Sequence, residues 1–421
     1  MRPILALCLI LLTATSAFAL DDEAERYVKL ALELGEYDPL YVDAYLGPDD
    51  WAKEAKDNLR PKDELAEDIS SLLLDLKKLS PTDAESIARH RALLRNVRAM
   101  DTRMRMVNGE TFSFAQEARL LYDVNLPVYD FSEFDRVLEK IDILIPGDGE
   151  LAERVDAFRN SLVIPDDARN AVMNQAINEC RQRSAEHISL PASEHFTLEY
   201  VHDQSWSAYN WYQGENESLM QINLDIPLKV YDAIGTGCHE GYPGHHVWNV
   251  LVENRLLKEN GWIEFSVFPL FSPAALIAEG SAEYGVHLAF PSSEKFEYER
   301  DILFPLAGLD PEKATILDEL KNLTAGLGNA TIATSQLYLD GEISREKAIE
   351  QFQKYSLISL ALAEQYLSFI DQYRSYVLNY SLGEDIVREY IESQGDDQQS
   401  RWEAFERMLT ELSFASDMTN N

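Results

Sequence analysis

Three of the eight histidines of this 421-residue chain lie within eight consecutive residues, beside a glutamate. The segment reads Cys238-His239-Glu240-Gly241-Tyr242-Pro243-Gly244-His245-His246. Neutral imidazole is a preferred ligand of Zn²⁺, and a carboxylate next to the first ligand can take a proton from a water molecule that zinc activates. We therefore expect a hydrolytic zinc site in this segment, with Glu240 as the general base.

The spacing of these histidines differs from that of the H-E-x-x-H motif, because Pro243 stands where the second histidine would lie. On a regular helix, residues six apart are separated by roughly 9 Å along the axis and point in different directions. Proline cannot donate to the carbonyl of His239, and Gly244 loosens the backbone, so the sequence predicts a kink or bulge here. Both His245 and His246 are candidates for the second ligand, because seven residues return to the same helical face.

The segment resembles the hallmark of the bacterial domain of unknown function 885 family, which is H-E-x-x-P-G-H-H followed by E-G-x-A-x-Y. The second part corresponds here to Glu279-Gly280-Ser281-Ala282-Glu283-Tyr284. That family is similar to the gluzincins, zinc peptidases in which two histidines and a downstream glutamate bind the metal. The resemblance implies that His239, His245 and Glu279 are zinc ligands and that Glu240 activates water.

The choice of His245 as the second ligand rests on analogy with gluzincins, which often have a small residue before that ligand, as Gly244 precedes His245 here. His246 would then support a ligand or contact the substrate. The resemblance covers residues 196–290 and weakens outside them. Within this span Ser281 replaces a usual tryptophan, so the resemblance does not extend to substrate preference.

Three further residues are candidates for contacting the substrate or stabilising an oxyanion. Tyr284 matches the family tyrosine, while Arg374 and Tyr376 offer guanidinium and hydroxyl donors. The alternative is a structural role, because tyrosines at helical spacing usually belong to the core. Glu283, one turn after Glu279, can either orient a ligand histidine or lie on the surface.

The pattern of elements around these residues predicts a mainly α-helical fold. The resemblance implies a multi-helical gluzincin-like metallopeptidase with a small β-sheet beside the metal-binding helix. Apolar residues recur at three- and four-residue spacing in the N-terminal half. This pattern predicts helices over 62–79, 81–106, 131–145 and 165–188. Strands are predicted over 196–201 and 219–224. We expect an N-terminal helical lobe, 20–190, and a zinc-binding catalytic lobe, 191–421, in one continuous domain.

The first 19 residues have the features of a signal peptide. One positive charge precedes an apolar run from Ile4 to Leu12, and Ala17-Phe18-Ala19 forms a small-x-small cleavage site. The run is shorter than the roughly 20 residues that cross a bilayer. We therefore expect cleavage after Ala19, no membrane insertion afterwards, and a periplasmic or extracellular protein.

Removal of this segment leaves two cysteines, Cys180 and Cys238. A disulfide is permitted in an exported protein, but a small buried cysteine beside His239 is equally compatible with the motif. Nothing in the sequence brings the two cysteines together, so we expect free thiols.

The net charge of −36 comes from 73 acidic and 37 basic residues spread along the chain. This charge repels nucleic acids and anionic membrane surfaces and favours solubility. The function that we expect is a zinc metallopeptidase acting on a peptide or a small amide. The alternatives are a hydrolase of non-peptide amides or esters with the same site, and a binding protein that retains zinc without turnover. The sequence leaves the oligomeric state open.

Overall fold

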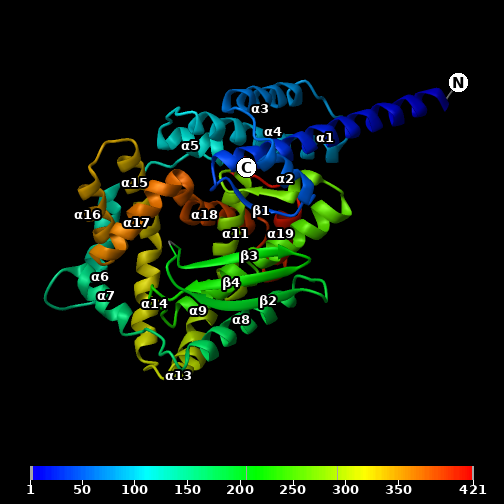
Figure 1. Cartoon of the computed structure of the whole chain (residues 1–421). Coiled ribbons are helices and arrows are strands. Elements are labelled where there is room, and N and C mark those ends of the chain that lie inside the picture. Colours follow the sequence, from blue (N-terminus) through cyan, green and yellow to red (C-terminus); the bar gives the residue numbers. More distant parts are fainter. Residues whose placement is uncertain (1–2, 205, 292, 420–421) are drawn as a thin grey trace.

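The computed structural model describes residues 3–204, 206–291 and 293–419. Helices dominate, and two small sheets lie among them (Figure 1). This architecture confirms the predicted mainly α-helical, multi-helical fold with a small sheet. None of the described helices combines the length and the apolar character needed to cross a membrane.

The N-terminal half consists of helices that follow the predicted periodicity. They are α1 (Pro3–Tyr37), α2 (Asp49–Asp57), α3 (Lys62–Leu76), α4 (Ala84–Val107), α5 (Phe114–Leu121), α6 (Phe131–Leu144), α7 (Leu151–Asn160) and α8 (Arg169–Ala185). Side-chain caps define some starts, since the Asp83 carboxylate accepts from the Ser86 amide at the beginning of α4. The helices predicted over 62–79, 81–106, 131–145 and 165–188 are α3, α4, α6 and α8, with ends shifted by a few residues.

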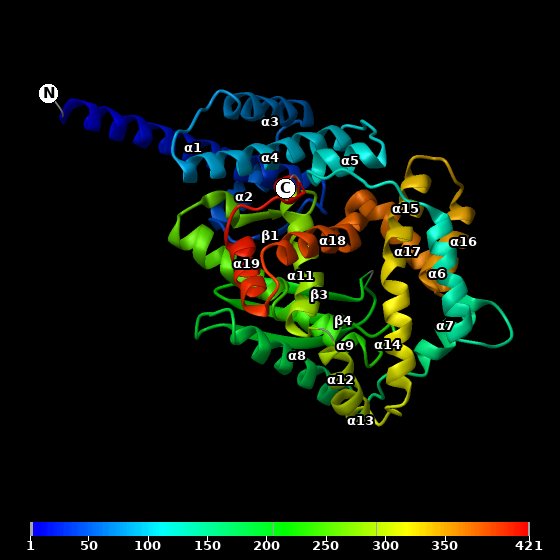
Figure 2. The same cartoon turned by 180° about the vertical axis from the view of Figure 1, so that it is seen from behind.

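Helix α1 includes most of the expected signal segment. Its first turns project away from the body, as Figures 1 and 2 show. From Leu20 onward its apolar side chains are buried in the core. The expected cleavage point after Ala19 thus lies where the helix meets the body, and cleavage there stays a prediction. Met1 and Arg2 lie outside the described residues.

The larger sheet has three strands, β2 (His195–Val201), β3 (Ala208–Gly214) and β4 (Glu217–Asn223), in the order β2-β4-β3. Strands β2 and β4 are the two predicted ones and run parallel, with Tyr200 opposite Ile222. Strand β3 pairs antiparallel with β4 and forms an edge of the sheet. The smaller sheet pairs β1 (Val42–Tyr45) with β5 (Val267–Pro269).

The C-terminal half is again helical. Its α-helices are α9 (Asp232–Thr236), α10 (His245–Leu251), α11 (Pro273–Ala289), α12 (Glu294–Tyr298), α13 (Phe304–Leu306), α14 (Lys313–Thr324), α15 (Gly328–Leu339), α16 (Arg345–Ser356), α17 (Leu360–Tyr373), α18 (Leu378–Ser393), α19 (Gln398–Thr410) and α20 (Ala415–Met418). The π-helical segments are η1 (Gly237–Gly241), η2 (Val252–Glu259) and η4 (Glu299–Leu303), and the 3₁₀ segments are η3 (Ile263–Ser266), η5 (Ala325–Leu327) and η6 (Arg374–Val377).

Two glycines bring α11 and α18 into backbone contact. A Cβ atom on Gly280 would lie 2.4 Å from the carbonyl carbon of Gly383, so neither helix could approach so closely with a side chain at residue 280. The glycine that follows Glu279 in the E-G-x-A-x-Y motif therefore has a packing role. This glycine allows α18 to pack closely against the helix that contains Glu279.

A continuous apolar core runs from Leu20 to Met418 and includes helices of both expected lobes. A disulfide also joins the lobes: Cys180 of α8 is bonded to Cys238 of η1, with their Cα atoms 5.3 Å apart. The expectation of free thiols is therefore wrong. Helix α8 packs directly against η1, a tertiary contact between distant segments that the spacing of the cysteines does not reveal.

Candidate metal centre

The segment that contains the candidate ligands His239 and His245 is not one continuous helix. His239 lies in η1, the chain turns at Tyr242-Pro243-Gly244, and α10 begins at His245. A Cβ atom on Gly244 would lie 1.8 Å from the carbonyl oxygen of His239, so only glycine fits this turn. The predicted irregularity is a complete interruption, and it brings the rings of His239 and His245 to a centroid separation of 4.7 Å.

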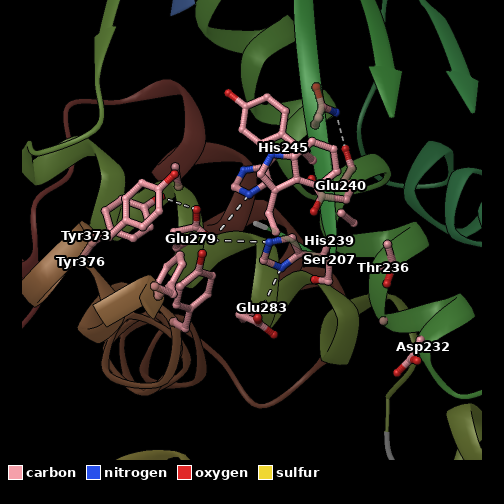
Figure 3. Close-up of a pocket in the computed structure, with 18 of the residues that line it drawn as sticks. Ser207, Asp232, Thr236, His239, Glu240, His245, Glu279, Glu283, Tyr373 and Tyr376 are labelled. Carbon is pink, nitrogen blue, oxygen red and sulfur yellow. Dashed lines mark hydrogen bonds and ion pairs between the residues drawn. The ribbon is translucent and has the colours of Figure 1, made fainter. Parts of the chain in front are cut away.

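The structure brings His239, His245 and Glu279 together in the lining of a cavity (Figure 3). One potential ligand atom from each residue lies within 4.8 Å of the others. Glu279 Oε2 is 3.5 Å from His239 Nε2 and 3.7 Å from His245 Nε2. It is buried and has no hydrogen-bond partner among the described residues. Two imidazoles and a buried carboxylate oxygen without a hydrogen-bond partner form a donor set that suits Zn²⁺.

The surroundings of this cluster favour a cation. Burial alone would lower the pKa of His239, but the neighbouring carboxylates of Glu283, Glu279 and Glu240 raise it to about 10. Burial would likewise raise the pKa of Glu279, but His245 and His239 hold it well below its usual range. The carboxylates around this cluster therefore favour positive charge, whether that of a protonated imidazole or that of a metal cation.

Two side chains support the candidate ligands. Glu283 Oε1 lies 3.5 Å from His239 Nδ1, on the side of the ring opposite Glu279. The Tyr376 hydroxyl donates to Glu279 Oε1 at 2.6 Å. Tyr376 was predicted to contact the substrate or an oxyanion. It does line the cavity, and its hydroxyl orients a candidate ligand.

His246 faces away from the three candidate ligands. It is fully buried, with Nδ1 2.8 Å from Ser218 Oγ and Nε2 3.0 Å from Glu194 Oε2. Consecutive helical residues point about 100° apart, so the second histidine of the pair faces the sheet. Both its nitrogens are occupied, which removes it as the alternative ligand. The Tyr242 hydroxyl also donates to Glu194, at 2.7 Å, so one carboxylate holds both sides of the Pro243-Gly244 turn.

Glu240 lines the same cavity and is largely buried, and this burial raises its pKa. Its backbone carbonyl accepts a hydrogen bond from the Asn210 side chain on β3. The edge strand thus holds the backbone of the candidate base. Sequence analysis missed Asn210 and Glu194, because neither lies in a motif and only the tertiary fold brings them to the segment.

The structure places two of the predicted substrate contacts outside the lining of the cavity. Arg374 donates to the buried carboxylate of Glu117 on α5, from Nε at 2.8 Å and from Nη2 at 2.6 Å. Tyr284 is buried against Phe405, with ring centroids 6.5 Å apart. Neither residue lines the cavity. Tyr284 follows Glu279 by five positions, which turns it about 140° around α11.

The cavity has a volume of about 770 Å³. One wall is α17, which presents side chains at helical spacing, namely Leu362, Gln365, Tyr366, Phe369 and Tyr373. Strand β3 contributes Ala208, Tyr209, Asn210, Trp211 and Tyr212. Among the described lining residues, the lysines and arginines are Lys295 and Lys321 alone. The cavity therefore combines an aromatic surface with a candidate metal centre and a pair of cations.

No family model matches this chain, and no curated protein matches it. Its fold is similar to the crystal structure of a "putative lipoprotein" from Colwellia psychrerythraea, with a TM-score of 0.52 and 16% identity over 87% of this chain and 70% of that chain. A "putative lipoprotein of unknown function" from Shewanella oneidensis aligns with a TM-score of 0.44 and 12% identity, over 86% of this chain and 76% of that chain. The first likeness concerns the fold alone.

Proposed function

We propose that this protein is a zinc-dependent hydrolase, and specifically a metallopeptidase. The observation that carries the proposal is the buried Glu279 Oε2, which has no hydrogen-bond partner among the described residues and faces the Nε2 atoms of His239 and His245. Three protein ligands leave a coordination position free for water or substrate, as in catalytic zinc sites. Glu240 lies in the same cavity and is not part of the ligand group.

A zinc ion in this site would polarise the scissile carbonyl and lower the pKa of a water molecule. Glu240 would accept the proton of the attacking water and pass it to the leaving amine. Asn210 and the Cys180–Cys238 disulfide hold the backbone of this glutamate and of η1. Tyr376 would keep Glu279 in place through its hydrogen bond.

We also propose that the protein is exported to a periplasm or out of the cell. The charge, apolar run and small-x-small site of residues 1–19 support export. The fold shared with a protein described as a lipoprotein agrees with it. The resemblance of the two motifs to the family of unknown function 885 supports the peptidase reaction.

Metal analysis paired with substrate profiling tests the proposal. We expect purified protein spanning residues 20–421 to contain about one zinc per chain and to cleave members of a mixed peptide library, detected by mass spectrometry. Removal of zinc by a chelator should abolish cleavage, and added zinc should restore it. Zinc with hydrolysis of esters or non-peptide amides only would replace the peptidase by the wider hydrolase. Zinc without any turnover would indicate a binding protein, and failure to take up zinc at neutral pH would overturn the proposal.

A further inference from the structure

The cavity contains a second cluster of charged groups, which the zinc chemistry does not use. Lys295 of α12 and Lys321 of α14 both line it, and both approach the same buried carboxylate. Lys321 Nζ is 3.4 Å from Glu299 Oε1, and Lys295 Nζ is 3.9 Å from that atom. Two ammonium groups therefore share one oxygen of one carboxylate.

The N–H groups of Lys295 and Lys321 are only partly hydrogen-bonded. Each ammonium has three N–H groups. At 3.9 Å, the distance from Lys295 to Glu299 exceeds that of a hydrogen bond. Asp232 also lines this part of the cavity, but its Oδ2 accepts from the Lys229 amide at 2.9 Å, and neither lysine lies within ion-pair distance of it in the described structure.

The crowding of the two cations has an electrostatic cost. Burial, together with the adjacent charge of Lys321, lowers the pKa of Lys295 to about 8. The side chains of Lys295 and Lys321 nevertheless remain 21% and 34% exposed, so the two lysines are open to a ligand entering the cavity. An anion placed between them would relieve their repulsion and fill their free donors.

The path from this cluster to the metal centre follows one helical face. Asp232, Thr236 and His239 line the cavity in succession, and Figure 3 shows Asp232 and Thr236 leading away from His239. The Lys321 ammonium lies over the ring of Tyr231 at the start of this path, 5.1 Å from its centroid. Seven helical residues span about 10 Å, which is the length of roughly three residues of extended peptide.

We propose that Lys295 and Lys321 bind a carboxylate of the substrate, about three residues beyond the bond that is cleaved. The inference rests on the proposed hydrolase function. It narrows the substrate class to peptides that have a carboxylate about three residues beyond the cleaved bond. The carboxylate can be the C-terminal one or that of an acidic side chain. Both present the same two oxygen acceptors to the lysines.

Binding of three capped peptides tests this inference separately from turnover. The probes are acetyl-Phe-Ala-Ala-Ala with a free C-terminal carboxylate, its C-terminal amide, and acetyl-Phe-Ala-Ala-Glu amide. They are titrated calorimetrically into the zinc-loaded Glu240→Gln variant, which should bind without cleaving. We expect the free acid, the glutamyl peptide or both to bind about tenfold more tightly than the neutral amide, since hydrogen bonds to charged groups are strong. The better binder identifies the source of the carboxylate.

Lys295→Met in the same background should remove this preference. The Lys321–Glu299 pair remains in that variant, so the fold should persist, and circular dichroism and zinc content check this. Lys295→Arg should retain most of the preference. Lys313→Met, on the same helix as Lys321 but outside the cavity, should leave it unchanged.

Equal binding of all three probes to the protein with both lysines would overturn the inference. So would a preference that persists in Lys295→Met and disappears on zinc removal, because the carboxylate would then bind the metal. A lysine-dependent preference in a protein that cleaves no peptide would support this subsite and contradict the proposed function instead.

Discussion

Two walls of the cavity are constructed in different ways. The proposed catalytic segment, residues 237–251, is held by a disulfide, by the Asn210 side chain and by Glu194, which accepts from Tyr242 and contacts His246. Another wall is α17, whose aromatic side chains contact one another. The ring centroids of Phe369 and Tyr373, for example, are 4.6 Å apart. The first wall is thus held by a covalent bond and buried polar contacts, whereas α17 presents packed rings to the cavity and has a polar contact at the exposed Asp371, which accepts from the Tyr338 hydroxyl at 2.8 Å.

The difference separates two tasks. Directional bonds fix atoms to within fractions of an ångström, which metal coordination and proton transfer require. An apolar helical face instead accepts ligands of varied shape, because dispersion and burial depend little on direction. We therefore expect changes in the catalytic segment to abolish the reaction and changes in α17 to adjust substrate affinity.

The largest expected effect is that of Gly244→Ala. Its added methyl group would lie 1.8 Å from the His239 carbonyl oxygen, so the turn between the two histidines must open. We expect loss of zinc binding and of activity, measured by metal analysis and peptide cleavage. The control is Gly326→Ala in η5, where no atom lies within 4 Å of the new Cβ and the residue does not line the cavity. Normal zinc content in Gly244→Ala would contradict the close approach.

Glu240→Gln should have the next largest effect. Glutamine has nearly the same shape as glutamate but cannot accept the water proton, so kcat should fall by about a hundredfold to ten-thousandfold. Zinc content and the thermal unfolding midpoint should stay near those of the unaltered protein. His239→Ala is the matched comparison and should lose zinc as well. Unchanged turnover in Glu240→Gln would make this glutamate structural.

The double substitution Cys180→Ala and Cys238→Ala tests the covalent anchor of the catalytic segment. The bond closes a 58-residue separation, so the chain-entropy relation gives a loss of about 4 kcal/mol in the free energy of unfolding, or roughly a thousandfold in the unfolding constant. Urea denaturation followed by circular dichroism measures this. Reductant should destabilise the unaltered protein and leave the variant unchanged. Equal stability of the two proteins would show that packing alone holds α8 against η1.

The smallest effect should come from the α17 wall. Phe369→Leu removes ring contacts with Tyr373 and Tyr366, each of which contributes about 0.5–1.5 kcal/mol to the packing of this wall. It also removes a ring that lines the cavity and can contact the substrate. We expect KM for peptides to rise about twofold to tenfold, with kcat and zinc content unchanged. Leu360→Ala is the control, because Leu360 is exposed on the same helix and does not line the cavity. A fall in kcat equal to that of Glu240→Gln would remove the distinction between the two walls.

The parts of the site that sequence predicted are those encoded within short segments. Amphipathic spacing predicted α3, α4, α6 and α8, and the two motifs indicated His239, His245 and Glu279, which the structure brings within 4.8 Å. Their binding of zinc stays a prediction. The pattern also indicated a kink or bulge at Pro243, where the structure has a complete interruption of the helix.

The parts that sequence missed depend on contacts between distant segments. Arg374 offered a free guanidinium in the sequence, but Glu117, 257 positions earlier, accepts its hydrogen bonds. The disulfide depends on α8 lying against η1, and the close approach of α11 and α18 depends on the contact between Gly280 and Gly383. A single sequence does not encode such pairings in any local period or spacing.

The disulfide also determines what proteolysis can separate. The loop at residues 202–204, which follows β2, is exposed and lies between the two bonded cysteines in the chain. A protease that cut there would leave the piece with both candidate histidine ligands covalently attached to the piece that ends in β2. Such nicked protein would run as two bands on a reducing gel and as one on a non-reducing gel.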